Sequence, residues 1–180
     1  ERGVVVDPTV TIFDSMFRHR SGELDPSYAM IAEHMPPAVR RAMLGGEMDI
    51  DESNADTYAR SADALLGMIA RLHAAGVPLV AGTDAMPGFT LHRELELYRQ
   101  AGIGNADVLR IATLDAAHVA GAAAESGSIS VGKRADFVLL AGNPLEDISA
   151  VRRPVAVFKG DRWYDPARLY EAVGIRPFTR

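Results

Sequence analysis

The stretch V-P-L-V-A-G-T-D-A-M-P-G, residues 77–88, decides the fold that the sequence predicts. Its apolar part, Val77–Ala81, is typical of a strand in a parallel sheet that is covered on both faces. The strand runs through Gly82 to Asp84, although a carboxylate at a buried strand end costs free energy if it is desolvated. Parallel strands often carry a functional group to the C-terminal rim of a barrel. Asp84 is therefore the first candidate catalytic residue.

Helical patterns flank this strand on both sides. Apolar residues at helical spacing predict a helix over Thr57–Ala75, directly before the strand. After the strand, the spacing predicts two more helices, over Leu91–Ala101 and Ala106–Ala120. Thr90 and Asn105 are the expected N-caps of these helices, because both side chains can accept a bond from a free backbone N–H.

A short strand, Val4–Val6, precedes these elements and is stopped by the Asp-Pro pair that follows it. The long connection over residues 7–56 contains two short helical patterns, Pro26–His34 and Pro36–Leu44, each with an early proline. Connections of this length are often functional lids, so we expect residues 7–56 to form a lid-like loop. The order strand, helix, strand, helix predicts an α/β fold with a parallel sheet.

The character of the sequence changes after Gly121, and we expect two domains, residues 1–121 and 122–180. The second should be a small β-rich domain segment that ends in a helix. Its expected elements are strands at Ser128–Val131, Asp136–Leu140, Ala156–Phe158 and Arg162–Tyr164, a hairpin turn at 159–161, and a helix at Pro166–Val173.

The composition excludes several classes of protein. The 180 residues are 48% hydrophobic and carry a formal net charge of −5, without the basic footprint of a nucleic-acid partner. The absence of cysteine excludes disulfides and thiolate metal sites. No apolar run approaches the ~20 residues that a membrane span needs, and no signal peptide is visible, so we expect a cytoplasmic protein with no membrane partner.

Five segments in a fixed order carry a family resemblance. They are G-V-P-L-V-A-G-T-D-A (76–85), L-H-R-E-L-E-L-Y-R-Q-A-G (91–102), A-D-V-L-R-I-A-T-L-D-A-A-H-V-A-G (106–121), G-S-I-S-V-G-K-R-A-D-F-V-L-L-A-G-N-P-L-E-D-I (127–148) and V-A-V-F-K-G (155–160). Together they resemble the C-terminal portion of the amidohydrolase superfamily, in its imidazolonepropionase-like and prolidase-like branch.

The resemblance implies a fold and a chemistry. It implies the last βα units of a (β/α)8 TIM-like barrel and the C-terminal piece of a small composite β domain. In the family, a hydroxide held by one or two divalent metal ions, most often zinc, attacks an amide, peptide or ring carbonyl. By position, Asp84 matches the carboxylate that touches the metal and transfers the proton. The implied substrate is a small-molecule amide or peptide, such as a cyclic amide or a dipeptide.

The sequence departs from the family in its metal ligands. Family members usually carry a His-x-His pair, and this sequence has none. One carboxylate cannot hold a catalytic metal, for which three protein ligands are typical. We therefore expect the 180 residues alone to be inactive, with a missing N-terminal segment or an oligomer partner supplying the rest. The alternative is a non-catalytic binding module derived from an amidohydrolase; a barrel that binds a phosphorylated ligand is disfavoured, because no glycine-rich phosphate loop follows the strand.

Other polar and apolar residues have weaker assignments. Thr83 and His92 are possible substrate-contacting or supporting residues, although a structural role for His92 is favoured. Gly82 is expected to allow close packing at the strand tip. The other histidines are expected to be structural or to lie in the long connection: His19, His34, His73 and His118. Four apolar residues should form either a lid or a small satellite core: Phe13, Met16, Phe17 and Met35.

Overall fold

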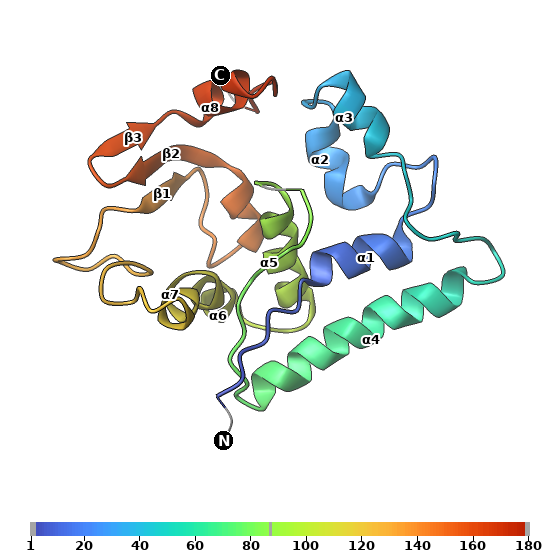
Figure 1. Ribbon diagram of the computed structural model, residues 1–180, viewed down its shortest axis with the longest axis horizontal. Coiled ribbons are helices and arrows are strands. Elements are labelled where there is room, and N and C mark those ends of the chain that lie inside the picture. The colour runs from blue at the N-terminus through green and yellow to red at the C-terminus, as the bar shows by residue number, and fades with distance from the viewer. Residues whose placement is uncertain (1–2, 87, 179–180) are drawn as a thin grey trace.

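Helix α5, Thr90–Gln100, lies at the centre of the molecule, and other helices pack around it (Figure 1). The computed structural model describes residues 3–86 and 88–178. Leu95, Leu97 and Tyr98 of α5 are buried and face the neighbouring helices, while its polar face reaches solvent. Residues 85–89 connect Asp84 to α5, and Tyr98 of α5 bonds to the Val80 carbonyl at 2.7 Å, which joins the strand to the core.

The remaining elements are short, apart from one long helix. In chain order they are α1 (Val10–Arg18), η1 (Pro26–Tyr28), α2 (Ala29–Ala32), α3 (Pro37–Ala42), α4 (Ala55–Ala74), α5, α6 (Asn105–Arg110), the π-helical η2 (Ile111–Asp115), α7 (Ala116–Val119), β1 (Phe137–Leu140), η3 (Ile148–Arg152), β2 (Pro154–Lys159), β3 (Arg162–Tyr164) and α8 (Pro166–Ala172). No helix in the described ranges is long and apolar enough to cross a membrane.

The parallel pairing that the sequence predicts is present but shorter than expected. Val6 and Leu79 form an isolated parallel bridge, with hydrogen bonds from Val6 N to Pro78 O and from Val80 N to Val6 O, both 3.0 Å. The parallel direction is confirmed, whereas the predicted strands Val4–Val6 and Val77–Ala81 are wrong in length. The pairing stops because the next residue that should donate is Pro8, which has no N–H.

The predicted helices are confirmed, but their starts differ. Helix α4 matches the helix expected before the strand, and α8 matches the C-terminal helix. Thr90 lies inside α5 rather than at its N-cap, because its hydroxyl donates to the Met86 carbonyl at 2.7 Å. Asn105 is likewise the first helical residue, since its side-chain amide donates to the Leu145 carbonyl at 2.9 Å. The single helix predicted after it is divided by the π-helical η2.

The connection over residues 7–56 is not a simple loop. It begins with α1, which the sequence analysis missed, and α1 packs along α4. Phe13 and Phe17 have ring centroids 6.3 Å apart, and Phe17 stacks on Tyr58 of α4 at 5.9 Å. Phe17 packs on α4, whereas Phe13 is exposed and Met35 belongs to a different cluster, so the four apolar residues do not form one satellite core.

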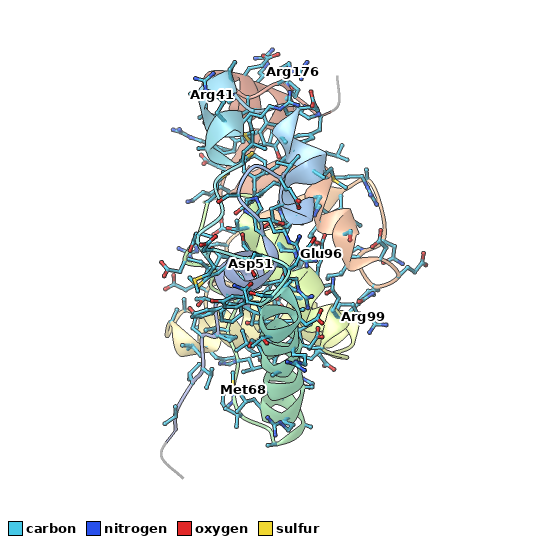
Figure 2. The ribbon with its side chains drawn as sticks, turned by 90° about the vertical axis from the view of Figure 1, so that its right-hand side faces the viewer. Arg41, Asp51, Met68, Glu96, Arg99 and Arg176 are labelled. Carbon is cyan, nitrogen blue, oxygen red and sulfur yellow. The ribbon has the colours of Figure 1, made fainter. Side chains whose placement is uncertain are left out.

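Two hydrophobic clusters hold the chain together. The larger joins α1, α4, α5, α6 and the bridged segments: Val10, Ile69, Leu79, Leu95, Leu97, Tyr98, Ile103, Val108, Ile111 and Ile148. The smaller joins the 19–44 region to the C-terminal segment: Ile31, Ala32, Met35, Met43 and Phe89, with Tyr170 and Phe178 against them. Figure 2 shows Arg41 and Arg176, beside the smaller cluster, at one end of the molecule and Met68 of α4 at the other.

The C-terminal region forms a three-stranded antiparallel sheet in the order β1-β2-β3. Phe137 pairs with Phe158 across β1 and β2, and their rings stack at 4.4 Å. The predicted hairpin turn lies between β2 and β3, where Lys159 pairs with Arg162. The predicted strand over Ser128–Val131 is wrong: glycines with positive φ at both flanks, 81° at Gly127 and 91° at Gly132, turn the chain away from the sheet.

Candidate functional site

Asp84 lies at the end of the bridged segment with its side chain exposed. Its φ of 45° places the backbone in the left-handed region, which few non-glycine residues adopt. Aspartate tolerates this conformation better than most residues, because its short side chain can bond locally. Thr83, beside it, is partly buried. The strand end therefore presents one carboxylate to solvent on a conformationally unusual backbone.

Side chains replace the next two bonds that the ladder would make. If the parallel pairing continued, Pro8 would donate to Val80 O and accept from Gly82 N. Proline cannot donate, and the Val80 carbonyl instead accepts from the Tyr98 hydroxyl at 2.7 Å. The Gly82 amide donates to Asp7 Oδ1 at 2.8 Å. The strand that leads to Asp84 is thus held at its tip by two side chains.

Gly82 is needed at this tip, as the sequence predicts. A Cβ at position 82 would overlap the carboxylate of Asp7, which lies over the Gly82 backbone. The sequence pattern indicates Asp7 only as part of the Asp-Pro pair that ends the strand Val4–Val6. Its signal in the sequence is that it ends Val4–Val6 with a carboxylate, just as Asp84 ends the next strand.

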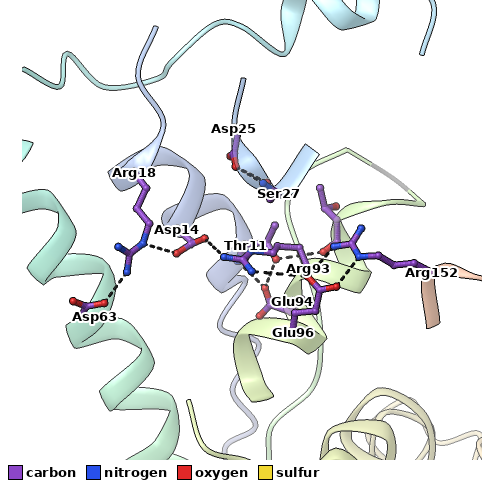
Figure 3. Close-up of polar contacts among 11 residues, drawn as sticks. Thr11, Asp14, Arg18, Asp25, Ser27, Asp63, Arg93, Glu94, Glu96 and Arg152 are labelled. Carbon is purple, nitrogen blue, oxygen red and sulfur yellow. Dashed lines mark hydrogen bonds and ion pairs between the residues drawn. The ribbon is translucent and has the colours of Figure 1, made fainter. Parts of the chain in front are cut away.

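Glu94 is the most buried charged group near the site, and the sequence analysis missed it. Its side chain, on α5, accepts from Val10 N at 3.0 Å, from Thr11 N at 2.7 Å and from the Thr11 hydroxyl at 2.7 Å (Figure 3). Thr9, the N-cap residue of α1, makes no capping bond with its side chain. Glu94 therefore caps α1 from another helix. Burial raises the pKa of Glu94 above its ordinary value, against the opposing effect of these donors.

A chain of ion pairs lies beside this cap and joins four elements, reaching α4 where Arg18 bonds to Asp63 at 2.7 Å (Figure 3). Asp14 of α1 accepts from Arg93 at 2.8 Å and from Arg18 at 3.0 Å. Glu96 of α5 receives a bidentate bond from Arg152 of η3, at 2.6 and 2.9 Å. Burial alone would raise the pKa of Glu96, but the bonds and charge of Arg152 hold it below its ordinary value. These pairs fix α1 and η3 on opposite sides of α5 and do not reach the exposed carboxylate of Asp84.

The histidines occupy structural positions rather than a common site. His19 is buried at the end of α1, with Nε2 2.7 Å from the Glu23 carbonyl. His34 places Nδ1 2.8 Å from the Arg176 carbonyl and stacks on Phe178 at 4.1 Å. His73 lies in α4 and His118 in α7, as the sequence predicts.

His92 of α5 is partly buried in a small and mostly apolar space. The residues that line the small space around it are Met30, Ile31, Phe89, Arg152, Tyr170 and Phe178. Burial, and then the positive charge of Arg152, lower the pKa of His92 from 6.5 to about 4. The neutral imidazole is therefore the form that the folded chain holds at neutral pH.

His92 should make the stability of the fold sensitive to acid. Because its folded pKa lies below its unfolded value, the unfolded chain takes up the proton first as the pH falls from 6.5 towards 4. The stabilisation is complete above pH 6.5, and we expect a loss of about 2 kcal/mol by pH 5 through this group. Chemical denaturation at pH 7 and pH 5 should show the loss, and His92→Gln should remove it. The exposed His118→Gln is the control; an equal pH dependence in all three proteins would contradict the assignment.

A metal site is not complete among the residues that the structure describes. No group of three or more His, Cys, Asp or Glu side chains within 3–86 and 88–178 is placed to hold an ion. Asp84 alone could contribute one oxygen ligand, whereas three protein ligands are typical of a catalytic zinc. The donor set in hand therefore does not fit a whole metal centre.

Comparisons with known proteins show which family the chain resembles. The amidohydrolase family profile matches residues 12–163. Ochratoxinase of Aspergillus niger is 33% identical over 109 residues, which cover 58% of this chain and 22% of ochratoxinase. The chain thus spans about a fifth of the length of the curated relatives it matches.

Solved structures show the same likeness at the level of the fold. A bottromycin amidohydrolase superposes with a TM-score of 0.69 at 23% identity, over 96% of this chain and 40% of that one. A Xaa-Pro dipeptidase with bound methionine gives 0.63 at 22% identity, over 91% and 35% of the two chains. The ochratoxinase structure gives 0.55 at 27% identity, over 64% and 28%. Each superposition covers less than half of the larger protein, so the fold shown is a partial one.

Proposed function

Because the chain belongs to the amidohydrolase family, we propose that it is the part of an amide-hydrolysing enzyme that carries the proton-transfer group. The observation that carries the proposal is Asp84, an exposed carboxylate at the end of a bridged parallel segment, inside the matched region. A catalytic acid or base must be open to substrate while its backbone is fixed. Asp84 is exposed, and side-chain bonds at Val80 O and Gly82 N hold the chain that leads to it.

The proposed role of Asp84 is to move one proton. Its carboxylate accepts a proton from the attacking water while the carbonyl carbon is attacked. It then delivers that proton to the leaving nitrogen, so that the amine departs neutral. The exposed position allows both transfers from one carboxylate.

The proposed architecture places this strand end at the rim of a (β/α)8 barrel. The bridged segments at Val6 and Leu79 would be neighbouring barrel strands, and residues 122–180 a segment of a small β domain. Residues 7–56 leave the first of these strands at its C-terminal end, on the catalytic side of such a barrel. We propose that this region, which contains α1, α2 and α3, covers the substrate.

The proposed cofactor is a divalent metal ion, with zinc as the first candidate. When bound, such an ion lowers the pKa of a water molecule and so supplies the nucleophile at neutral pH. Asp84 would provide one ligand, and the described residues do not provide the others. We propose that a longer protein or a partner chain contributes them.

The proposed substrates are small molecules with an amide or peptide bond, including dipeptides and cyclic amides. Solved relatives include a Xaa-Pro dipeptidase and a bottromycin amidohydrolase, which support this range without selecting within it. The alternative is a binding module that has kept the fold and lost the reaction, for which Asp84 would be a remnant.

An activity screen of the full-length protein tests the proposal. The protein, loaded with zinc, is expected to hydrolyse at least one of three groups: dipeptides with C-terminal proline, N-acyl amino acids, and cyclic amides. A chelator should abolish the activity, and added metal should restore it. Binding of these compounds with no release of amine over the whole panel would favour the binding module instead.

A further inference from the structure

Near Asp84, the backbone amide of Gly82 makes a hydrogen bond to a side chain instead of a backbone bond of the parallel ladder. Pro8 follows Asp7 and has no N–H to donate to Val80 O, so the parallel pairing ends before the Gly82 amide can join it. Asp7 Oδ1 accepts from this amide at 2.8 Å. The carboxylate of one segment end therefore holds the backbone of the next, at a point two residues before Asp84.

The backbone beyond Gly82 needs such support. Asp84 has φ 45°, a conformation that costs free energy in a residue other than glycine. A strained residue persists only where its surroundings hold it in place. In the segment just before Asp84, the Tyr98 hydroxyl donates to Val80 O, and Asp7 accepts a hydrogen bond from Gly82 N.

We infer that Asp7 is a positioning residue, whose carboxylate fixes the Gly82 amide and thereby the direction of the Asp84 side chain. The inference rests on the proposed function, because it gives Asp7 a part in the same reaction. Asp7 is exposed and on the surface of the described chain, so its bond contributes little to global stability. Its effect should therefore show in the reaction rather than in unfolding.

Substitutions at Asp7 separate this role from a role of its charge. In the full-length protein, Asp7→Ala removes the acceptor, and we expect kcat to fall by about 10- to 100-fold with little change in KM. Asp7→Asn keeps an oxygen that can accept from Gly82 N, and it should recover most of the activity. Equal losses in both variants would mean that the charge matters, and wild-type kcat in Asp7→Ala would overturn the inference outright.

Gly82→Ala approaches the same contact from the other side. The added Cβ would overlap the Asp7 carboxylate and displace it from the Gly82 amide. We expect a fall in kcat like that of Asp7→Ala. Gly67→Ala in α4 is the matched control, because a Cβ there meets nothing within 4 Å. A Gly82→Ala protein as active as this control would contradict the inference.

Hydrogen exchange reads the contact independently of turnover. The Gly82 amide should exchange at least about 10-fold faster in Asp7→Ala than in wild type, and slowly again in Asp7→Asn. If wild type hydrolyses amides and Asp84→Asn does not, while Asp7→Ala is normal, the inference fails and the proposed function stands. If wild type hydrolyses nothing, the proposed function fails; unchanged Gly82 exchange in Asp7→Ala would then refute the contact itself.

Discussion

Asp84→Asn in the full-length protein is expected to lower kcat for amide hydrolysis by about 100- to 10,000-fold, the usual contribution of a positioned acid or base. The amide side chain is nearly the same size but cannot accept the proton of the attacking water. Asparagine also adopts the left-handed backbone conformation readily, so φ 45° at this position should be kept. The free energy of unfolding should change by less than about 0.5 kcal/mol, because the side chain is exposed.

The measurement is steady-state hydrolysis beside chemical denaturation of the same preparations. Asp161→Asn is the matched control, since Asp161 is an exposed aspartate in the turn between β2 and β3. It should leave both kcat and stability unchanged. A kcat for Asp84→Asn within a few fold of the control would contradict the assignment of Asp84. No residue of this chain would then be assigned to proton transfer.

The elements that the sequence predicts well are those fixed by local pattern. Helix α4 is predicted by the helical spacing of its leucines and isoleucine. The end of the segment after it is predicted because the polar residues Thr83 and Asp84 follow the apolar run Val77–Ala81. The parallel direction of the Val6–Leu79 bridge is also anticipated, because the order strand, helix, strand, helix favours a parallel sheet, although the register is not. The parallel pairing is short because Pro8 has no N–H. The sequence pattern indicates that Pro8 ends Val4–Val6, but it does not indicate that Pro8 also limits the pairing with the second strand.

The site residues that were missed depend on partners distant in the sequence. Glu94 contacts Val10 and Thr11, from which it is separated by 84 and 83 positions in the sequence. Asp7 contacts Gly82, at a separation of 75 positions. No local spacing encodes such contacts. One signal was nevertheless present: Glu94 lies one helical turn before Leu97 and Tyr98, so it interrupts the apolar face of α5. A charge on a buried face needs partners, and here they are the free N–H groups of α1.

That burial makes Glu94 the residue whose loss should most destabilise the fold. Glu94→Ala would leave two buried backbone N–H groups of α1 without their acceptor, while the Thr11 hydroxyl would keep the Thr90 carbonyl at 3.3 Å. Each buried donor that loses its acceptor costs about 1–3 kcal/mol. Removing a buried carboxylate also removes its desolvation cost, which offsets part of this loss. We therefore expect a net loss of about 2–4 kcal/mol at pH 7.

Chemical denaturation of wild type, Glu94→Ala and the exposed control Glu171→Ala measures the loss, and hydrogen exchange at Val10 and Thr11 locates it. In Glu94→Ala these two amides should exchange at the rate of a frayed helix end, while amides in α4 keep more of their protection. The free energy of unfolding of Glu94→Gln should lie between those of wild type and Glu94→Ala. The Gln oxygen still accepts a hydrogen bond, whereas its NH2 group would face N–H donors that it cannot bond to. A loss below about 1 kcal/mol in Glu94→Ala would show that water or another acceptor caps α1 instead. With the cap lost, the first turn of α1 would fray, although the Arg93–Asp14 pair still joins α1 to α5. The chain from Asp7 to α1 would then lose part of its fixed path, so stability and the position of Asp7 are coupled through one buried carboxylate.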